Sequence, residues 1–520
     1  MLKFKQGEDR RQSLLFPRSI EEYIEKDHLA RVVLAIVEML NLDKIINKFS
    51  ELGQNAYNPV MLVSILFYGY AIGIRSSRKL SRACEERLDF IYLSANLRPS
   101  YKTISEFRRS NLAELREIFK DVVVIGVNLG LVKIGNIKIS LDGSKMRANA
   151  SSRKSKDEDG LRHLLEQVDG QIRGILEEAE QIDQQEDREY GDLRGDELPE
   201  ELRDLARQRA RLAEAIEELK RKKERMEEKI LEDKGSITKK EQGQIEKQKI
   251  NLTDGDARYM KERNGCIRSN YNSQLCVDEE EQFIVANDVT QNANDKGQLV
   301  GMVEQCQENL GCPIDELKAD SGYHSIDNLE ELSQRQIDGY IDDPNKGKLG
   351  NEEHKFDKAN FSYDQERDVY ICPHEKELIF KKEGLKGGRR VRVYQCSDCP
   401  GCQDKQQCTS SSYRRIERLE GEDLVEANRA RILSEEGKKR YKKRMYTVEP
   451  VFGHLKFNLG YRHFLLRGIG RVKGEFNLMC IGYNLKKIAR LILNKGISVL
   501  KGLNNVNYII NTSNIAVEVV

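Results

Sequence analysis

The feature that most constrains the fold is a long charged block at residues 155–250. It holds 20 Lys/Arg and 28 Asp/Glu residues, with Tyr190 as its only aromatic residue. A segment of this composition cannot bury enough apolar surface to form a globular core. Its apolar residues recur at intervals of three, four and seven: Leu161, Leu165, Val168, Ile172, Ile175, Leu205, Leu212, Leu219 and Met226. The spacing predicts a helical hairpin with its turn at residues 191–200. We interpret it as a solvated coiled-coil insertion, with a dimer contact or a DNA clamp as alternatives.

The segment before this block reads as helical. Apolar residues at spacings of three and four, as in HLARVVLAIVEML and NPVMLVSILFYGYAIGI, predict an all-helical domain over residues 1–130. Its second half is rich in basic residues: Arg75, Arg78, Lys79, Arg82, Lys102, Arg108 and Arg109. Around short helices, such residues suit helix-turn-helix contacts with DNA. A solvated basic face is an equally good interpretation.

Short strand-like runs flank the charged block. NIKISL ends at Asp142, two adjacent strands and a helix follow the block, and IDELKAD ends at Asp320 before another helix and strand. This order, three strands, a helix, a strand, a helix and a strand, is RNase H-like. We therefore expect an α/β core with an RNase H-like fold. Its first parts are residues 131–154 and 251–345, and its final part is 416–500. The insertion between them costs little, because loop-closure entropy grows slowly with length.

A cysteine-bearing insertion at residues 346–415 interrupts this core, and residues 501–520 form a short tail. Five of the 11 cysteines lie here: Cys372, Cys396, Cys399, Cys402 and Cys408. In a large chain without a secretory signal, such a group favours metal binding over disulfides. Two Cys-x-x-Cys steps suit tetrahedral Zn²⁺. Which four ligate stays open, His374 could substitute for one, and unligated thiols are the alternative.

Charge is strongly segregated although the net charge is only +1. Residues 438–490 hold 14 Lys/Arg and two acids, Glu449 and Glu475. The basic residues nearest Glu449 are Lys442, Lys443, Arg444, Lys456, Arg462, Arg467, Arg471 and Lys473. Such a cluster attracts a phosphate backbone, whereas a merely solvated face would carry more interspersed acids. Tyr461, His463 and Phe464 could stack on unpaired bases, although core packing is the more common role.

No run approaches the roughly 20 apolar residues of a membrane span, and the N-terminus lacks a secretory signal. We therefore expect a soluble, cytoplasmic protein without a membrane partner.

Three acids carry the candidate chemistry: Asp142, Asp320 and Glu449. Gly and Ser directly after or near the two aspartates are typical of a turn that carries a ligand. Two Mg²⁺ ions (or Mn²⁺) about 4 Å apart need bridging carboxylates to act on a phosphate, and water and phosphate supply the other ligands. Neighbouring sheet positions would bring the aspartates together, and a packed helix would add Glu449.

The blocks LDGSKMRANAS, KADSGYHS and VEPVFGHLKFNLGYRHFLLRG resemble the signature blocks of bacterial insertion-sequence DDE transposases, in the branch with an N-terminal helical domain and a cysteine-bearing insertion. The resemblance covers roughly residues 15–490. It implies an RNase H-like core and metal-binding roles for Asp142, Asp320 and Glu449.

The family pattern around the last acid is Tyr, Arg, Glu and Lys, and here Tyr441, Glu449 and Lys456 keep it. Arg444 is displaced by one residue from its usual spacing to the Glu, which turns it by about 100° on an ideal helix. Lys456 is therefore the safer phosphate contact. Pro450 predicts a helix start or a kink beside Glu449.

The expected function is a transposase that binds the terminal inverted repeats of its element, cleaves at the ends and joins them to target DNA. Pairing of two ends implies a homodimer or a larger assembly. Two alternatives remain: a DNA-binding regulator derived from a transposase that does not cut, and an RNase H-like nuclease without joining activity.

Overall fold

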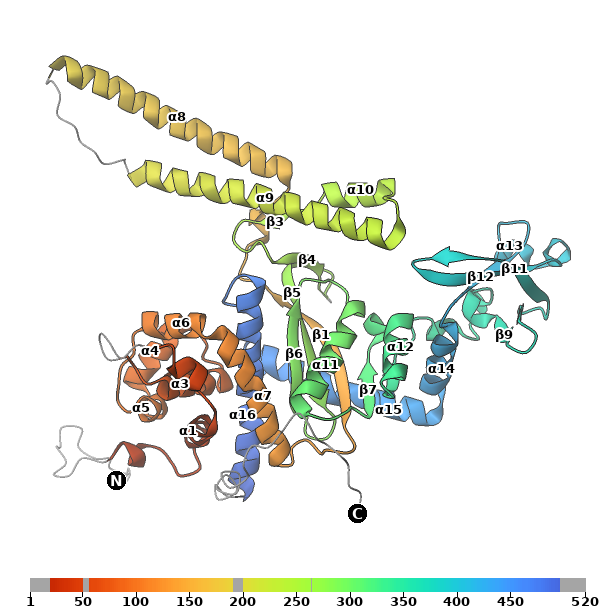
Figure 1. Cartoon of the computed structure of the whole chain (residues 1–520), viewed down its shortest axis with the longest axis horizontal. Helices are drawn as coiled ribbons and strands as arrows, with labels where there is room; N and C mark the ends of the chain where they lie inside the picture. The colour runs from red at the N-terminus through yellow and green to blue at the C-terminus, as the bar shows by residue number, and fades with distance from the viewer. Residues whose placement is uncertain (1–18, 50–55, 190–199, 263, 496–520) are drawn as a thin grey trace, which may run out of the picture.

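The computed structural model describes residues 19–49, 56–189, 200–262 and 264–495. It is a mixed α/β structure: a helical N-terminal region packs beside a central sheet, a long pair of helices projects from that sheet, and a second, smaller sheet lies beyond its far edge (Figure 1). The expected turn at 191–200, apart from Glu200, and the tail 501–520 lie outside the described residues. No described helix combines the length and the apolar character needed to cross a membrane.

The N-terminal region packs around α3. Asn58 Oδ1 accepts the Val60 N–H at 2.8 Å, and Pro59 occupies the first helical position, so the helix begins with both common start signals. Nearly all of α3 is buried, because its sequence is apolar on every side. The helices here are α1 (Leu29–Met39), α2 (Asp43–Ile46), α3 (Pro59–Ala71), α4 (Ser77–Glu86), α5 (Leu88–Leu93), α6 (Tyr101–Ser110) and α7 (Leu112–Asn128).

The central sheet has the strand order β4-β5-β1-β7-β8, with β6 also paired to β5. β1 pairs antiparallel with β5 and parallel with β7, and β7 pairs parallel with β8. In the parallel β1–β7 register, Leu141 lies opposite Ala319. The strands are β1 (Lys138–Arg147), β4 (Arg258–Lys261), β5 (Ile267–Asp278), β6 (Ile284–Thr290), β7 (Glu316–Ala319) and β8 (Asp338–Ile341).

Asp142 lies within a strand, and the expectation that it ends one is wrong. β1 continues through Gly143 and Ser144, because the long strand β5 pairs with it from Asp278 to Asn270. The DGS sequence is therefore strand rather than turn. The expectation for Asp320 is confirmed: β7 ends at Ala319, and Asp320 precedes a 3₁₀ turn, η4 (Ser321–Tyr323).

Helices cover the sheet and join it to the N-terminal region. α11 packs on β6 and β5, α15 packs against β1, β5, β7 and β8, and α16 contacts β6, α3 and α7. A π-helical turn, η9 (His454–Asn458), follows α15. The helices are α11 (Leu299–Leu310), α12 (Ile326–Gln334), α14 (Glu422–Leu433), α15 (Glu435–Gly453) and α16 (Ile469–Lys495).

Pro450 lies inside α15, so the expected helix start at this residue is wrong. A proline has no N–H for the carbonyl four residues earlier, here that of Tyr446. Gln282 Nε2 donates to the Tyr446 carbonyl oxygen at 2.8 Å and satisfies it. A side chain from the β5–β6 connection thus stabilises the helix that carries Glu449.

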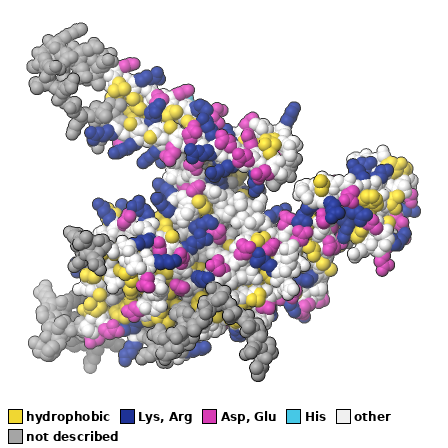
Figure 2. Space-filling view, viewed as in Figure 1, with side chains coloured by type: hydrophobic (Ala, Val, Ile, Leu, Met, Phe, Trp, Pro, Cys, Tyr) yellow, Lys and Arg dark blue, Asp and Glu magenta, His cyan; other side chains and the backbone are white. Residues whose placement is uncertain are grey.

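The charged block forms two long helices, α8 (Glu158–Glu189) and α9 (Glu200–Lys234), followed by α10 (Lys239–Glu246). Short strands β2 (Ser155–Lys156) and β3 (Ile250–Asn251) pair at its base. Its interior is a thin apolar seam that includes Leu161, Val168, Leu212 and Leu219. Acidic and basic side chains intermingle over its outer surface (Figure 2). The pair projects from the sheet as a separate arm (Figure 1).

The cysteine-bearing segment contains a second sheet that the sequence analysis did not predict. Its order is β13-β12-β11-β10-β9, and every described neighbouring pair is antiparallel. The longest strand, β11, is exposed along most of its length and rich in lysine, so its sequence lacks the alternation of apolar and polar residues that predicts a strand. The strands of this sheet are β9 (Ser362–Asp364), β10 (Val369–Ile371), β11 (Glu377–Lys386), β12 (Arg389–Cys396) and β13 (Arg415–Leu419).

α16 joins the helical region to the sheet through buried polar contacts. Asn484 accepts the Ile284 N–H at 3.0 Å and donates to the Ile284 carbonyl at 2.8 Å, which covers part of the open edge of β6. Glu475 is fully buried, and it accepts hydrogen bonds from Arg75 Nη1 at 2.9 Å and from the N–H groups of Leu465 and Leu466. One carboxylate therefore fixes three separate segments.

We predict that Glu475→Ala destabilises the protein by about 3 kcal/mol, because it leaves Arg75 as an uncompensated buried charge. Urea unfolding followed by circular dichroism measures the change. Glu436→Ala is the matched control: its ion pair with Arg440 is solvent-exposed on the glutamate side, and its loss should cost no more than about 0.5 kcal/mol. Equal effects of the two substitutions would contradict the structural role of Glu475.

Candidate active site

Asp142 and Asp320 are neighbours on adjacent parallel strands. Leu141 and Ala319 are paired, so the next residue on each strand is one of the two aspartates. Each carboxylate is oriented by a nearby backbone group: Asp142 Oδ1 accepts the Gly143 N–H and Asp320 Oδ1 accepts the Gly322 N–H, both at 2.9 Å. The sheet therefore brings together two acids that are far apart in the sequence.

Glu449 reaches the same place from α15. Arg444, one and a half turns earlier on that helix, lies between the acids: Nη1 is 3.3 Å from Asp142 Oδ2, and Nη2 is 3.3 Å from Glu449 Oε1. Despite its displaced spacing, Arg444 is thus directed into the acid cluster. The Arg444 side chain is 11% exposed, Asp142 16% and Glu449 42%, so the cluster opens to solvent on the glutamate side.

Burial and mutual repulsion disfavour the charged forms of the two aspartates. Burial raises the pKa of Asp142 to about 7, Asp320 and Glu449 add to the increase, and Arg444 opposes it. Burial also raises the pKa of Asp320, against the Gly322 N–H and Arg444. These are carboxylates that a further cation would stabilise.

Asp295 is a fourth acid beside this cluster, and the sequence analysis missed it. It follows β6, and its Oδ1 accepts hydrogen bonds from Asn272 Nδ2 at 2.6 Å and Gln274 Nε2 at 2.7 Å. Gln274 lies opposite Gly143 across the β1–β5 pair, and its Oε1 accepts the Tyr323 hydroxyl. Asp295 therefore fixes two side chains of β5, the strand next to β1.

The glycines beside both aspartates face this network. A Cβ on Gly143 would lie 2.5 Å from Asp295 Oδ1 and from Gln274 Nε2. A Cβ on Gly322 would lie 2.9 Å from Asp320 Oδ1 and 3.2 Å from Asp295 Oδ2. Both positions need glycine because the Asp295 side chain comes close to the backbone there, a reason that differs from the turn expected from the sequence. In the sequence, the glycine near each aspartate was the feature that could have indicated a closely packed neighbour.

The predicted DNA-binding residues fall into two groups. Arg462, Arg467 and Lys443 are exposed: Arg462 stacks over Phe457, Arg467 donates to the Asn149 carbonyl, and Lys443 pairs with Glu279 at 2.6 Å. Lys456 lies on the π-helical turn and donates to Ser144 Oγ and to the Lys145 carbonyl, next to Asp142 on β1. Burial lowers the pKa of Lys456 to about 8, although Asp142 opposes the change.

Arg108 does not lie where DNA could reach it. It is 5% exposed, and its guanidinium donates to the Tyr70 hydroxyl, the Arg75 carbonyl and Ser77 Oγ. The expectation of a DNA contact at Arg108 is therefore wrong. The buried Arg108 guanidinium instead holds parts of the helical region together through its hydrogen bonds. Tyr461 and Phe464 are fully buried, which confirms core packing for these two rings, whereas His463 is exposed.

The five predicted zinc ligands, Cys372, Cys396, Cys399, Cys402 and Cys408, all line one small cavity in the second sheet, together with His374. None of them is in a disulfide. As the side chains stand, no group of three or more His, Cys, Asp or Glu residues in the described ranges is arranged to hold a metal ion. Asp142, Asp320 and Glu449 do not form such a group because the Arg444 guanidinium lies between Asp142 and Glu449.

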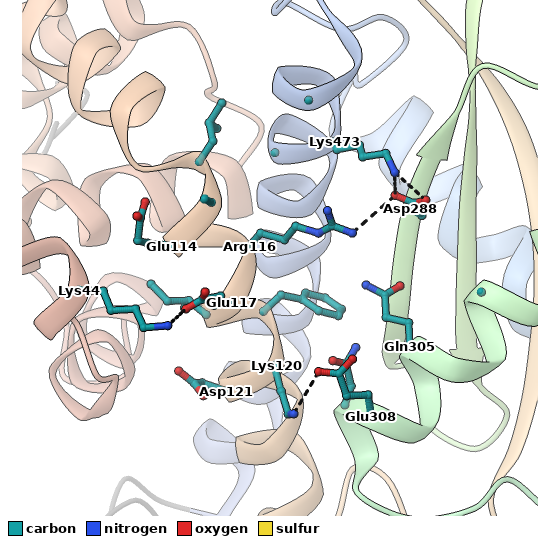
Figure 3. Close-up of a pocket in the computed structure, with 18 of the residues that line it drawn as sticks. Lys44, Glu114, Arg116, Glu117, Lys120, Asp121, Asp288, Gln305, Glu308 and Lys473 are labelled. Atoms are coloured by element: carbon teal, nitrogen blue, oxygen red, sulfur yellow. Dashed lines mark hydrogen bonds and ion pairs between the residues drawn. The ribbon is translucent and has the colours of Figure 1, made fainter. Parts of the chain in front are cut away.

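A large cavity lies elsewhere, between α7, α11 and α16, with a volume of about 1270 Å³ (Figure 3). Its walls carry charges of both signs, paired as Lys44–Glu117, Lys120–Glu308 and Lys473–Asp288. Asp142, Asp320 and Glu449 are not among its lining residues. Its charges are already neutralised by neighbours, so it is a seam between the helical region and the sheet rather than a polyanion site.

Comparison with protein families gives two matches. A model described as "Transposase DDE domain" matches residues 371–489, which include Glu449 and the five clustered cysteines, and a model described as "Transposase domain (DUF772)" matches residues 18–110 in the helical region. Asp142 and Asp320 lie outside both matches. No curated protein and no solved structure matched the chain. Both family matches are to transposase domains, and together they support an insertion-sequence DDE transposase.

Proposed function

We propose that the protein catalyses DNA cleavage and strand transfer with Asp142, Asp320 and Glu449 as its catalytic residues. The observation that carries this proposal is the position of Arg444, which contacts both Asp142 and Glu449 while Asp142 adjoins Asp320 on the next strand. Three acids from three distant segments thus share one partly open site. A structural role alone gives no reason for gathering acids that repel one another.

The sheet supports an RNase H-like core. β6, β5 and β1 are antiparallel neighbours in sequence order, and β7 and β8 extend the sheet in parallel on the other side of β1. This is the spatial arrangement expected for three consecutive strands followed by two that are joined through helices. Asp142 on the central strand and Asp320 beside it then occupy the middle of the sheet.

The donor set fits Mg²⁺ or Mn²⁺. All three groups are carboxylates, which these cations prefer, and burial raises the pKa of Asp142 and of Asp320, so a cation that stabilises their charged forms would be favoured there. A pair of bound ions would supply activation of water or a 3′-hydroxyl and stabilisation of the leaving oxygen. Asp142, Asp320 and Glu449 would hold them.

Arg444 is suited to leave the acids when DNA and metal arrive. Its two contacts are 3.3 Å long, and its buried Nε and Nη1 atoms have no hydrogen-bond partner. A guanidinium held this loosely can reorient towards a phosphate at low cost, because phosphate offers the bidentate hydrogen bonds that it lacks. Arg444 would then bind the DNA backbone beside the site.

Exposed cations extend from the acid cluster along the expected path of the DNA. Lys443 lies on α15, and Arg462 and Arg467 follow the π-helical turn. We assign them to backbone contacts with terminal inverted repeats and target DNA, and Lys456 to positioning β1 beside the phosphate. Joining two ends implies a homodimer or a larger assembly. DNA binding by residues 1–130 stays a prediction.

We predict that Asp142→Asn, Asp320→Asn and Glu449→Gln each reduce Mg²⁺-dependent cleavage of labelled element-end duplex by more than about 100-fold, because each removes a direct metal ligand. Binding of the same duplex, measured by gel shift in Ca²⁺, should persist. Glu38→Gln, an exposed acid on α1, is the control and should cleave normally.

Each rival function gives a different result in this assay. A non-cutting regulator would bind the ends, and its wild-type form would not cleave them in Mg²⁺ or Mn²⁺. A nuclease without joining activity would cleave but would not link the 3′ ends to a target plasmid. Cleavage that survives all three substitutions would remove these acids from the mechanism.

We also predict that Asp295→Asn weakens the apparent Mg²⁺ affinity about 10- to 100-fold, because Asp295 positions Gln274, which lies opposite Gly143 and accepts the Tyr323 hydroxyl beside Asp320. The Mg²⁺ concentration for half-maximal cleavage measures this, and saturating Mg²⁺ should restore much of the rate. Asp204→Asn is the control, since this exposed acid on α9 pairs with Arg207 on the projecting helices. If Asp295→Asn leaves the Mg²⁺ dependence unchanged while the wild-type chain cleaves, Asp295 has no positioning role.

A further inference from the structure

The second sheet has too small a core to be stable without a further constraint. Its buried cluster is Phe361, Tyr370, Leu378, Tyr394, Cys396, Cys399 and Ile416. Two of these residues are cysteines, and most of β11 is exposed. Units with so little buried apolar surface usually depend on disulfides or a structural metal.

The strand register brings the cysteines to one end of this sheet. Leu378 pairs with Tyr370 on one side and with Cys396 on the other, so the turn that holds Cys372 lies beside the end of β12. Cys399 begins the 3₁₀ turn η8 (Cys399–Gly401), and Cys408 ends α13 (Lys405–Cys408). Three separate chain segments therefore converge on one point.

These segments enclose a cavity of about 30 Å³. A cavity of this size has room for one water molecule or ion. The lining residues are the five cysteines, the apolar Phe356, Phe361 and Leu378, and the polar or charged His374, Lys376, Asp398, Lys405, Thr409 and Arg414. A cavity of single-ion size lined by five thiols suits a metal with sulfur ligands.

Backbone N–H groups already point at two of the sulfurs. The N–H groups of His374 and Lys376 donate to Cys372 Sγ at 3.4 and 3.3 Å, and the Arg414 N–H donates to Cys399 Sγ at 3.3 Å. Such bonds favour a thiolate and fix its direction. His374 Nε2 is bonded to Asp404 Oδ2 at 2.7 Å, so only its Nδ1 could bind a metal, and the thiols are the more numerous ligands around the cavity.

Packing selects four of the five cysteines. Cys396 and Cys399 belong to the buried cluster, and Cys372 and Cys408 pack against it, whereas Cys402 does not. Cys402 also lines the cavity, so the packing, and not the position around the cavity, is what distinguishes it from the other four.

We propose that Cys372, Cys396, Cys399 and Cys408 bind one Zn²⁺ ion that stabilises the second sheet. The backbone positions are in place, and the thiols complete the site by rotating about their side-chain bonds, since the sulfurs do not yet converge as a ligand group. Each ligating thiol loses its proton to solvent as the Zn–S bond forms. The site is separate from the acid cluster, so it does not depend on the proposed catalysis.

The test uses the full chain expressed in zinc-supplemented medium, purified under reducing conditions and analysed by plasma mass spectrometry. We expect about one zinc ion per chain. Zinc should be lost in Cys372→Ser and Cys399→Ser and retained in Cys402→Ser. Cys266→Ser is the control. This exposed cysteine lies between β4 and β5 of the central sheet, and its substitution should leave the zinc content unchanged.

A second measurement uses the wild-type chain, so its result does not depend on whether the cysteine variants fold. Cobalt added to the chelator-treated wild-type chain should produce the intense thiolate-to-cobalt charge-transfer band of a tetrahedral sulfur site, and zinc should abolish it. The absence of both zinc and this band overturns the site. Loss of zinc in Cys402→Ser equal to that in Cys399→Ser overturns the ligand set.

Discussion

The parallel pairing of β1 with β7 is the contact on which the rest of the site depends. It aligns Leu141 with Ala319 and so places Asp142 beside Asp320. Burial raises the pKa of each of these carboxylates, and neighbouring acids add to the increase. Arg444, on α15, offsets part of this increase, and a divalent cation would offset more. The sheet thus holds two aspartates close together, which is electrostatically unfavourable without a cation. The same placement favours the binding of a metal ion and its phosphate ligand.

Several features serve to hold α15 against this pair of strands. The proline beside Glu449 would weaken the helix, yet Gln282 bonds the carbonyl that Pro450 leaves free. Lys456, on the π-helical turn that follows, is hydrogen-bonded to β1 at Ser144 and Lys145. A π-helical turn inserts one extra residue and changes the direction of the side chains after it. This local geometry lets one helix carry Arg444 and Glu449 to the acids and the next turn carry Lys456 to the adjacent strand.

The sequence predicted most of the core because its strands and helices have clear periodicity and its acids follow apolar runs. It misjudged Asp142, since Gly143 and Ser144 resemble a turn, whereas pairing with β5 keeps them in a strand. It also placed Arg108 on a DNA-binding face, although buried hydrogen bonds hold that residue inside the helical region. Asp295 escaped notice because its role comes from Asn272 and Gln274, and no motif spacing records those contacts.

The sequence by itself determined the resemblance to transposases, the helical character of the charged block, and which acids and cysteines are the candidates. Each follows from residue type and local spacing. Only the tertiary structure decided that Arg444 lies between Asp142 and Glu449, that Asp295 bonds two side chains of β5, and that Cys402 lies outside the cluster to which the other four cysteines belong or against which they pack. These contacts depend on strand register and helix packing between distant segments, and local sequence does not encode such distances.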